Sequence, residues 1–165
     1  MARYLRDKQI RNITIDASAL RQIFQAFAVN GSRMPEYLAS DPENRDGALA
    51  VTIRFDEKGY RTFDLESLLR YFNDAKDVER VIFEVFTGDS LRTNRQTGSY
   101  ADLRLDRSDN VSCFLTVSSD DESWMQGTFA AIDDAIYQHK NRNVGSVGFR
   151  RVHRLNMPPD CGGAA

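Results

Sequence analysis

Residues 49–72, LAVTIRFDEKGYRTFDLESLLRYF, contain a strand, a turn, a second strand and a helix in direct succession. Every second residue from Leu49 to Phe55 is apolar, which is the period-2 pattern of a strand that packs on one face. Gly59 ends the turn that follows, where its lack of a Cβ allows unusual backbone angles. After Asp64, which is a good helix N-cap, the apolar residues follow helical spacing. The unit therefore predicts an antiparallel hairpin followed by an amphipathic helix.

The same two patterns recur on both sides of this unit. Helical spacing predicts two further helices, over residues 17–29 and from Ser119 to about His139. Strand patterns occur in five further segments: residues 10–15, 81–86, 101–106, 111–117 and 149–155. Residues 32–47 and 87–99 are polar, contain glycine or proline and are predicted as loops. The sequence predicts an α+β fold with a mainly antiparallel sheet of about six or seven strands and three amphipathic helices packed largely on one face.

Length and composition are those of one globular domain. The chain has 165 residues, of which 41% are hydrophobic and 28% charged, and a domain typically has about 100–200 residues. We expect a single α+β domain over residues 1–155 and a flexible tail or linker over residues 156–165. No apolar run reaches the roughly 18 residues of a membrane-spanning helix, so no membrane span is predicted in this chain.

Positive charge is concentrated at the two ends of the chain. The formal net charge is −2, but residues 1–11 carry +3, residues 139–154 carry +5 and residues 12–138 carry −9. If the two basic ends lie together in space, they form one positive face. Such a face would attract an anionic partner even though the whole chain is slightly acidic.

The C-terminal basic segment also contains a glycine motif. Residues 145–148 read GSVG and lead directly into an arginine-rich stretch. Backbone N–H groups in a glycine turn can bind an anion, and arginine can hold a phosphate with two hydrogen bonds. The candidate binding residues are Lys140, Arg142, Gly145, Gly148, Arg150, Arg151, His153 and Arg154. The simpler interpretation is a helix-ending glycine followed by an edge strand that arginine protects from pairing.

Catalytic and metal-binding motifs are absent from the sequence. The two histidines are 14 residues apart and the two cysteines 48 apart, which fits no common zinc spacing. We predict no cofactor and no metal, and interpret Cys113 as a small buried residue in a reducing, cytoplasmic protein. Asp102 and Asp106 lie on one strand face and could share a cation or act as an acid–base pair. The simpler interpretation is a solvated outer face with Arg104 between the two acids.

Two residues of the last helix are notable. Trp124 is expected in the core, or, if it is exposed beside Tyr60 or Tyr100, as an aromatic anchor for a partner. Gly127 lies within the first turns of the helix and suggests a close approach of another backbone or a ligand.

Three classes of function remain open. The leading hypothesis is a non-catalytic interaction or sensor domain of a cytoplasmic protein that binds a partner protein or a ligand, and a homo-oligomer is also considered. The second is binding of nucleic acid or another polyanion through the basic C-terminal segment, with Tyr137 or Phe149 available for stacking. The third is a small metal-dependent hydrolase or nuclease that uses Asp102 and Asp106. The absence of a catalytic signature favours a protein that is not an enzyme.

Overall fold

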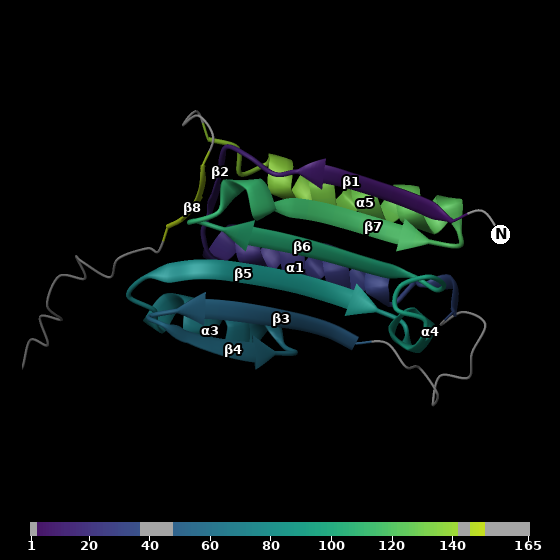
Figure 1. The fold of residues 1–165 in the computed structure, drawn as a ribbon. Helices are drawn as coiled ribbons and strands as arrows, with labels where there is room; N and C mark the ends of the chain where they lie inside the picture. Colours follow the sequence, from purple (N-terminus) through teal and green to yellow (C-terminus); the bar gives the residue numbers. More distant parts are fainter. Residues whose placement is uncertain (1–2, 37–47, 142–145, 151–165) are drawn as a thin grey trace, which may run out of the picture.

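The computed structural model of the protein describes residues 3–36, 48–141 and 146–150, and for residue 48 the backbone alone. Its centre is an antiparallel six-stranded sheet with the strand order β1-β7-β6-β5-β3-β4 (Figure 1). The strands are β1 (Tyr4–Gln9), β3 (Ala48–Phe55), β4 (Lys58–Thr62), β5 (Val78–Phe86), β6 (Tyr100–Asp106) and β7 (Phe114–Ser119). Strands β1 and β4 therefore form the two edges.

Three helices cover one face of this sheet, and no helix of the described residues covers the other (Figure 1). They are α1 (Ala17–Gly31), α3 (Leu65–Asp74) and α5 (Glu122–Tyr137). Each begins at an aspartate, Asp16, Asp64 or Asp121, whose side chain accepts a hydrogen bond from a backbone N–H of the first turn. The predicted α+β class and the placement of the helices on one face are confirmed. Within the described ranges, none of the helices combines the length and apolar character needed to cross a bilayer.

The hydrophobic core lies between the helices and the sheet. Phe27 of α1 stacks on Phe83 of β5 with ring centroids 5.4 Å apart. Trp124 is 9% exposed and its indole Nε1 donates to the carbonyl of Asn30, so it is a core residue as expected. The close approach of another backbone predicted at Gly127 is wrong: a Cβ there would meet no atom within 4 Å, because this glycine lies on the solvent side of α5. The alternative, a ligand at this position, stays a prediction.

A second, two-stranded sheet was not expected as a separate unit. Strands β2 (Ile13–Ile15) and β8 (Val147–Phe149) pair in parallel. The strand predicted over residues 10–15 is shorter than expected because Asn12 has a positive φ of 58°, which an extended strand does not accommodate. Residues 151–155 of the last predicted strand lie outside the described residues.

Three local differences from the sequence predictions have simple causes. Strand β1 was not anticipated because charged residues occupy its alternating positions. The predicted loop 87–99 contains a short helix, α4 (Gly88–Arg92), which the side chain of Thr87 caps. Val111, predicted to face inward on a strand, is 74% exposed in a turn, η2 (Asn110–Ser112), and β7 begins only after it.

Candidate binding site where the two basic segments meet

The two basic ends of the chain lie side by side in the described residues. The parallel ladder places Ile13 opposite Val147 and Ile15 opposite Phe149. Backbone hydrogen bonds extend the contact, from Asn141 N–H to the Asn12 carbonyl (2.7 Å) and from Arg150 N–H to the Ile15 carbonyl (2.8 Å). Further bonds come from the end of α5, so β2 is held between β8 and the helix terminus. Of the basic residues at the two ends, Lys8, Arg11 and Lys140 come together here, whereas Arg3 lies beside Asp120 at the start of β1.

A groove of about 160 Å³ opens at this junction, between the β1–β2 connection and the C-terminal end of α5. Its apolar lining includes the buried residues Ile10, Ile13 and Ile136. The polar and charged lining residues are Lys8, Gln9, Arg11, Asn12, Asp133, Tyr137 and Lys140. The groove thus combines an apolar floor with a rim on which cations outnumber acids.

The cationic side chains on the rim of the groove differ in whether they are already paired with a carboxylate. Lys8 forms a salt bridge with Asp133, with 2.9 Å between Nζ and Oδ1. Arg11 donates to the side-chain oxygen of Gln9, and the Nζ of Lys140 lies 4.4 Å from the ring centroid of Tyr137, a side chain that is 59% exposed. Among the described residues, neither Arg11 nor Lys140 contacts a carboxylate. These two side chains are therefore the ones placed to bind an anion.

Three of the eight predicted binding residues can be placed. Lys140 lines the groove, Gly148 lies within β8 opposite Thr14, and Arg150 is exposed directly after β8. Arg142, Gly145, Arg151, His153 and Arg154 lie outside the described residues, so the proposed glycine turn is not tested.

Sequence reasoning missed Lys8 and Arg11 as site residues. The net positive charge of residues 1–11 was the available signal. It could not be assigned to a site without knowing that β1 and β2 reach the end of α5.

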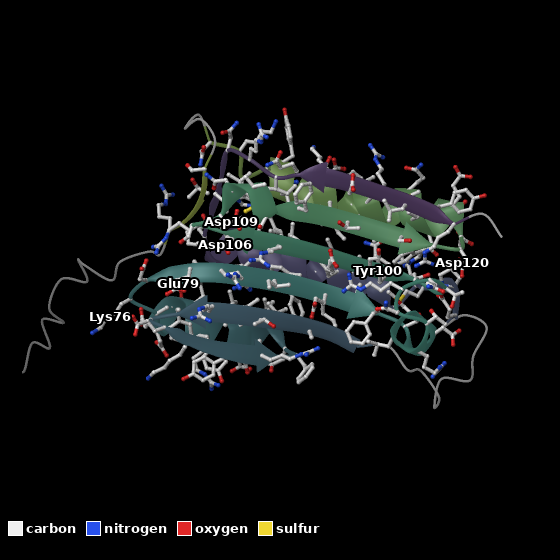
Figure 2. The ribbon with its side chains drawn as sticks, viewed as in Figure 1. Lys76, Glu79, Tyr100, Asp106, Asp109 and Asp120 are labelled. Atoms are coloured by element: carbon white, nitrogen blue, oxygen red, sulfur yellow. The ribbon has the colours of Figure 1, made fainter. Side chains whose placement is uncertain are left out.

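Asp102 and Asp106 are each neutralised by arginine on the face of the sheet that carries no described helix. Figure 2 shows Asp106 near the end of β6 opposite to that of Tyr100. An oxygen of Asp102 lies 2.8 Å from Arg95 Nη1, and one of Asp106 lies 2.8 Å from Arg80 Nε. Burial raises the pKa of Asp102. Burial also opposes ionisation of Asp106, but hydrogen bonds, above all from Arg80, outweigh it and lower the pKa of that carboxyl.

This arrangement does not resemble a metal centre or a nucleophile site. In the part of the chain that the structure describes, no three His, Cys, Asp or Glu residues are grouped so that they could hold a metal ion. Cys113 is fully buried, and its Sγ donates to the Asp106 carbonyl at 3.2 Å. Burial raises the pKa of this thiol, which keeps it protonated and unreactive. The interpretation of Cys113 as a small buried residue is confirmed.

Compared with known proteins, the chain matches no family model, no curated protein and no solved structure. The site is therefore described from its own geometry alone.

Proposed function

We propose that the protein is a non-catalytic interaction domain that binds an acidic segment of a partner protein at the junction groove. The observation that carries this proposal is the combination of an apolar floor with Arg11 and Lys140, two exposed cations on the rim without a carboxylate partner in the described residues. We also propose a cytoplasmic location. Its support is the low cysteine content and the buried free thiol of Cys113, both of which are typical of proteins in a reducing compartment.

The size of the groove favours a protein partner over a small ligand. Pockets for cofactors and nucleotides typically measure about 300–1,000 Å³, whereas this groove has about 160 Å³. That volume accommodates one apolar side chain and not a nucleotide. An anchor side chain in a small pocket is a common way in which one protein binds another.

The charge of the rim favours carboxylates next to that anchor. The C-terminal end of a helix carries a partial negative charge, so the end of α5 itself repels an anion. Attraction must therefore come from the side chains of Arg11 and Lys140. Carboxylates flanking an apolar residue would meet these cations while the apolar side chain contacts Ile10, Ile13 and Ile136.

The proposal can be tested with a random peptide library displayed on phage. The library is selected on the wild-type protein, and the enriched peptides are then measured on the wild type and on the double variant Arg11→Glu, Lys140→Glu. We expect enriched peptides to carry Asp or Glu next to a large apolar residue. Their dissociation constant should rise by about tenfold or more on the double variant, because two attractions become repulsions.

The matched control is Arg33→Glu, an exposed arginine beyond the far end of α1. Helix α1 begins beside β2 and has 15 residues, so Arg33 lies about 20 Å away from the junction. This variant should bind the peptides as the wild type does. Enrichment of peptides without acidic residues, or equal binding to the double variant, would contradict the proposal.

Nucleic acid is the competing ligand class, because the exposed ring of Tyr137 beside Lys140 could stack on a base. A fluorescent single-stranded oligonucleotide distinguishes the two. If the protein bound it with an affinity that falls steeply with salt and depends on Tyr137, the polyanion hypothesis would replace the acidic-peptide one.

A further inference from the structure

The outer edge of β4 is open. Strand β4 is the last strand of the sheet on the side opposite β1, and within the described ranges no strand pairs with its outer edge. Residues Lys58 to Arg61 are exposed. An edge strand of this kind presents unpaired backbone N–H and C=O groups, which can pair with a strand of another chain.

Exposed aromatic side chains flank this edge on both faces of the sheet. On the helix side, the ring of Tyr60 lies between those of Phe55 and Tyr71, with centroids 5.4 Å and 4.6 Å away, and Tyr60 is still 37% exposed. On the other face, Phe63 is 63% exposed beside Arg61. Burial of these rings would add apolar contact to any backbone pairing at this edge.

We propose that β4 pairs antiparallel with β4 of a second copy of this chain, about a two-fold axis at Tyr60. The two six-stranded sheets then form one continuous sheet, with the helices of both copies on the same face. The interface is isologous, so it closes at a dimer and leaves the β1 edge unchanged. It is independent of the junction groove, which adjoins β1 at the opposite edge.

The side chains of β4 favour this particular partner and register. With Tyr60 opposite its own copy, Lys58 faces Thr62 and Arg61 faces Gly59 of the second chain. No cation then opposes a cation, and Gly59 leaves space for the long side chain of Arg61. Like charges directly opposite each other destabilise a pair of strands, so registers centred on Lys58 or Arg61 are disfavoured. Tyr60 is the middle residue of β4, so the register centred on it also pairs all five residues of the strand.

The same argument disfavours self-pairing at β1 in the registers that pair most of the strand. The register centred on Arg6 places this arginine opposite its own copy. The register centred on Asp7 places two aspartates opposite each other and Arg6 opposite Lys8. Both central registers of Tyr4–Gln9 therefore bring like charges together, and β4 is the edge at which a second copy fits.

Gly59 provides a sharp test, because a side chain at this position would face Arg61 of the second copy. A Cβ there meets no atom within 4 Å, so the substitutions should not disturb the fold. Gly59→Lys should raise the dimer dissociation constant by about tenfold or more and Gly59→Glu should lower it, since each contact occurs twice. Sedimentation equilibrium over a concentration series measures both, and circular dichroism verifies the fold.

Engineered cysteines test the register separately. In a background with Cys161→Ala, Tyr60→Cys should form a disulfide-linked dimer on mild oxidation, because residues directly opposite each other have Cα atoms about 4.5–5.5 Å apart. Lys58→Cys is the matched control and should remain unlinked, since it faces Thr62 of the second copy and not itself. A monomeric mass at all concentrations, insensitivity to both Gly59 variants, equal cross-linking at the two positions, or growth beyond a dimer would each overturn the proposal.

Discussion

The two edges of the sheet are attached to their helices in different ways. At β1, the guanidinium carbon of Arg6 lies 4.1 Å from the ring centroid of Phe129 in α5, and Lys8 pairs with Asp133 of the same helix. At β4, the only helix-facing ring is that of Tyr60, which stacks on Tyr71 of α3. The β1 edge thus uses charged side chains for packing, whereas the β4 edge uses aromatic ones that remain partly exposed.

This difference shows that the charge of an edge strand has two effects. The aliphatic portions of long cationic side chains can cover apolar surface while their charged ends stay in water. The same charges prevent β1 from pairing with a copy of itself. At β4 the aromatic packing provides no such protection, and its self-pairing is limited only by two cations.

The largest expected effect tests whether β1 depends on the buried ring beneath it. Phe129→Ala removes a ring that is 1% exposed and should lower the free energy of unfolding by about 3–5 kcal/mol. Tyr71→Ala, the corresponding change beneath β4, should cost clearly less because that ring is only partly buried. Urea unfolding measures both. Equal losses would remove the contrast between the two edges.

The next effect concerns the β5–β6 pairing, where the half of the sheet that ends at β1 meets the half that ends at β4. Asp106 on β6 binds Arg80 on β5, and Arg104 lies 3.4 Å from the same oxygen. Asp106→Asn removes the charge of a nearly buried side chain. We expect a loss of about 1.5–3 kcal/mol at neutral pH.

The pH dependence gives this prediction a direction. The pKa of Asp106 is lower in the folded protein than in the unfolded chain, so its contribution is complete above about pH 4 and is lost as the pH falls through the folded pKa. The difference in the free energy of unfolding between wild type and Asp106→Asn should therefore become smaller in acid.

Asp102→Asn is the control. Because the pKa of Asp102 is raised, its ionised form costs stability at neutral pH, and the variant should be as stable as the wild type or more stable. A loss at Asp102 equal to that at Asp106 would contradict this account.

A smaller effect of opposite sign is expected in the helix beneath β1. Gly127→Ala should raise the stability by about 1 kcal/mol, because alanine favours the helix and the added Cβ meets no atom within 4 Å. Gly31→Ala at the end of α1 is the matched control and should destabilise, since its Cβ would lie 2.8 Å from a methyl group of Val85. Thermal unfolding of both variants measures the difference, and a destabilised Gly127→Ala would show an unrecognised contact on this face of α5.

The smallest effect concerns the salt bridge between β1 and α5. A double-mutant cycle with Lys8→Ala and Asp133→Ala should give a coupling energy of about 0.2–1 kcal/mol, because both side chains are partly exposed to solvent. The coupling should decrease further in high salt. A coupling comparable to the loss in Phe129→Ala would mean that the ion pair, and not the ring, attaches β1.

The sequence predicted those helices and strands in which the apolar residues recur with a regular helical or strand spacing. The hairpin around Gly59 and the three helices have regular apolar spacing, and each was found close to its predicted position. Strand β1 could not be predicted, because Arg6 and Lys8 occupy positions where an apolar residue would signal packing. Arg6 packs on Phe129 and Lys8 pairs with Asp133, and both partners are more than 120 residues away in the sequence. Gly127 was misjudged for a different reason: the glycine was interpreted as a sign of close packing, although the apolar spacing of Met125, Phe129 and Ile132 places residue 127 on the opposite side of the helix.

Of the candidate binding site, only its concentration of positive charge could be predicted from the sequence. The sequence shows the two basic ends and makes Lys140 and Arg150 candidate binding residues, but the groove between Ile10 and Ile136 is a tertiary feature. Nothing in the sequence near Arg11 indicated that it lies beside Lys140.

The parallel pairing of β2 with β8 has a consequence for synthesis of the protein. Ile13 is made early and pairs with Val147, so this contact has a very large sequence separation, and contacts of this kind form late in folding. A nascent chain can assemble the hairpin around Gly59 and the helix after it long before residue 147 is translated. The parallel ladder beside the junction groove, by contrast, is completed only when β8 emerges, so a ribosome-bound intermediate would hold most of the sheet before β2 has its partner strand.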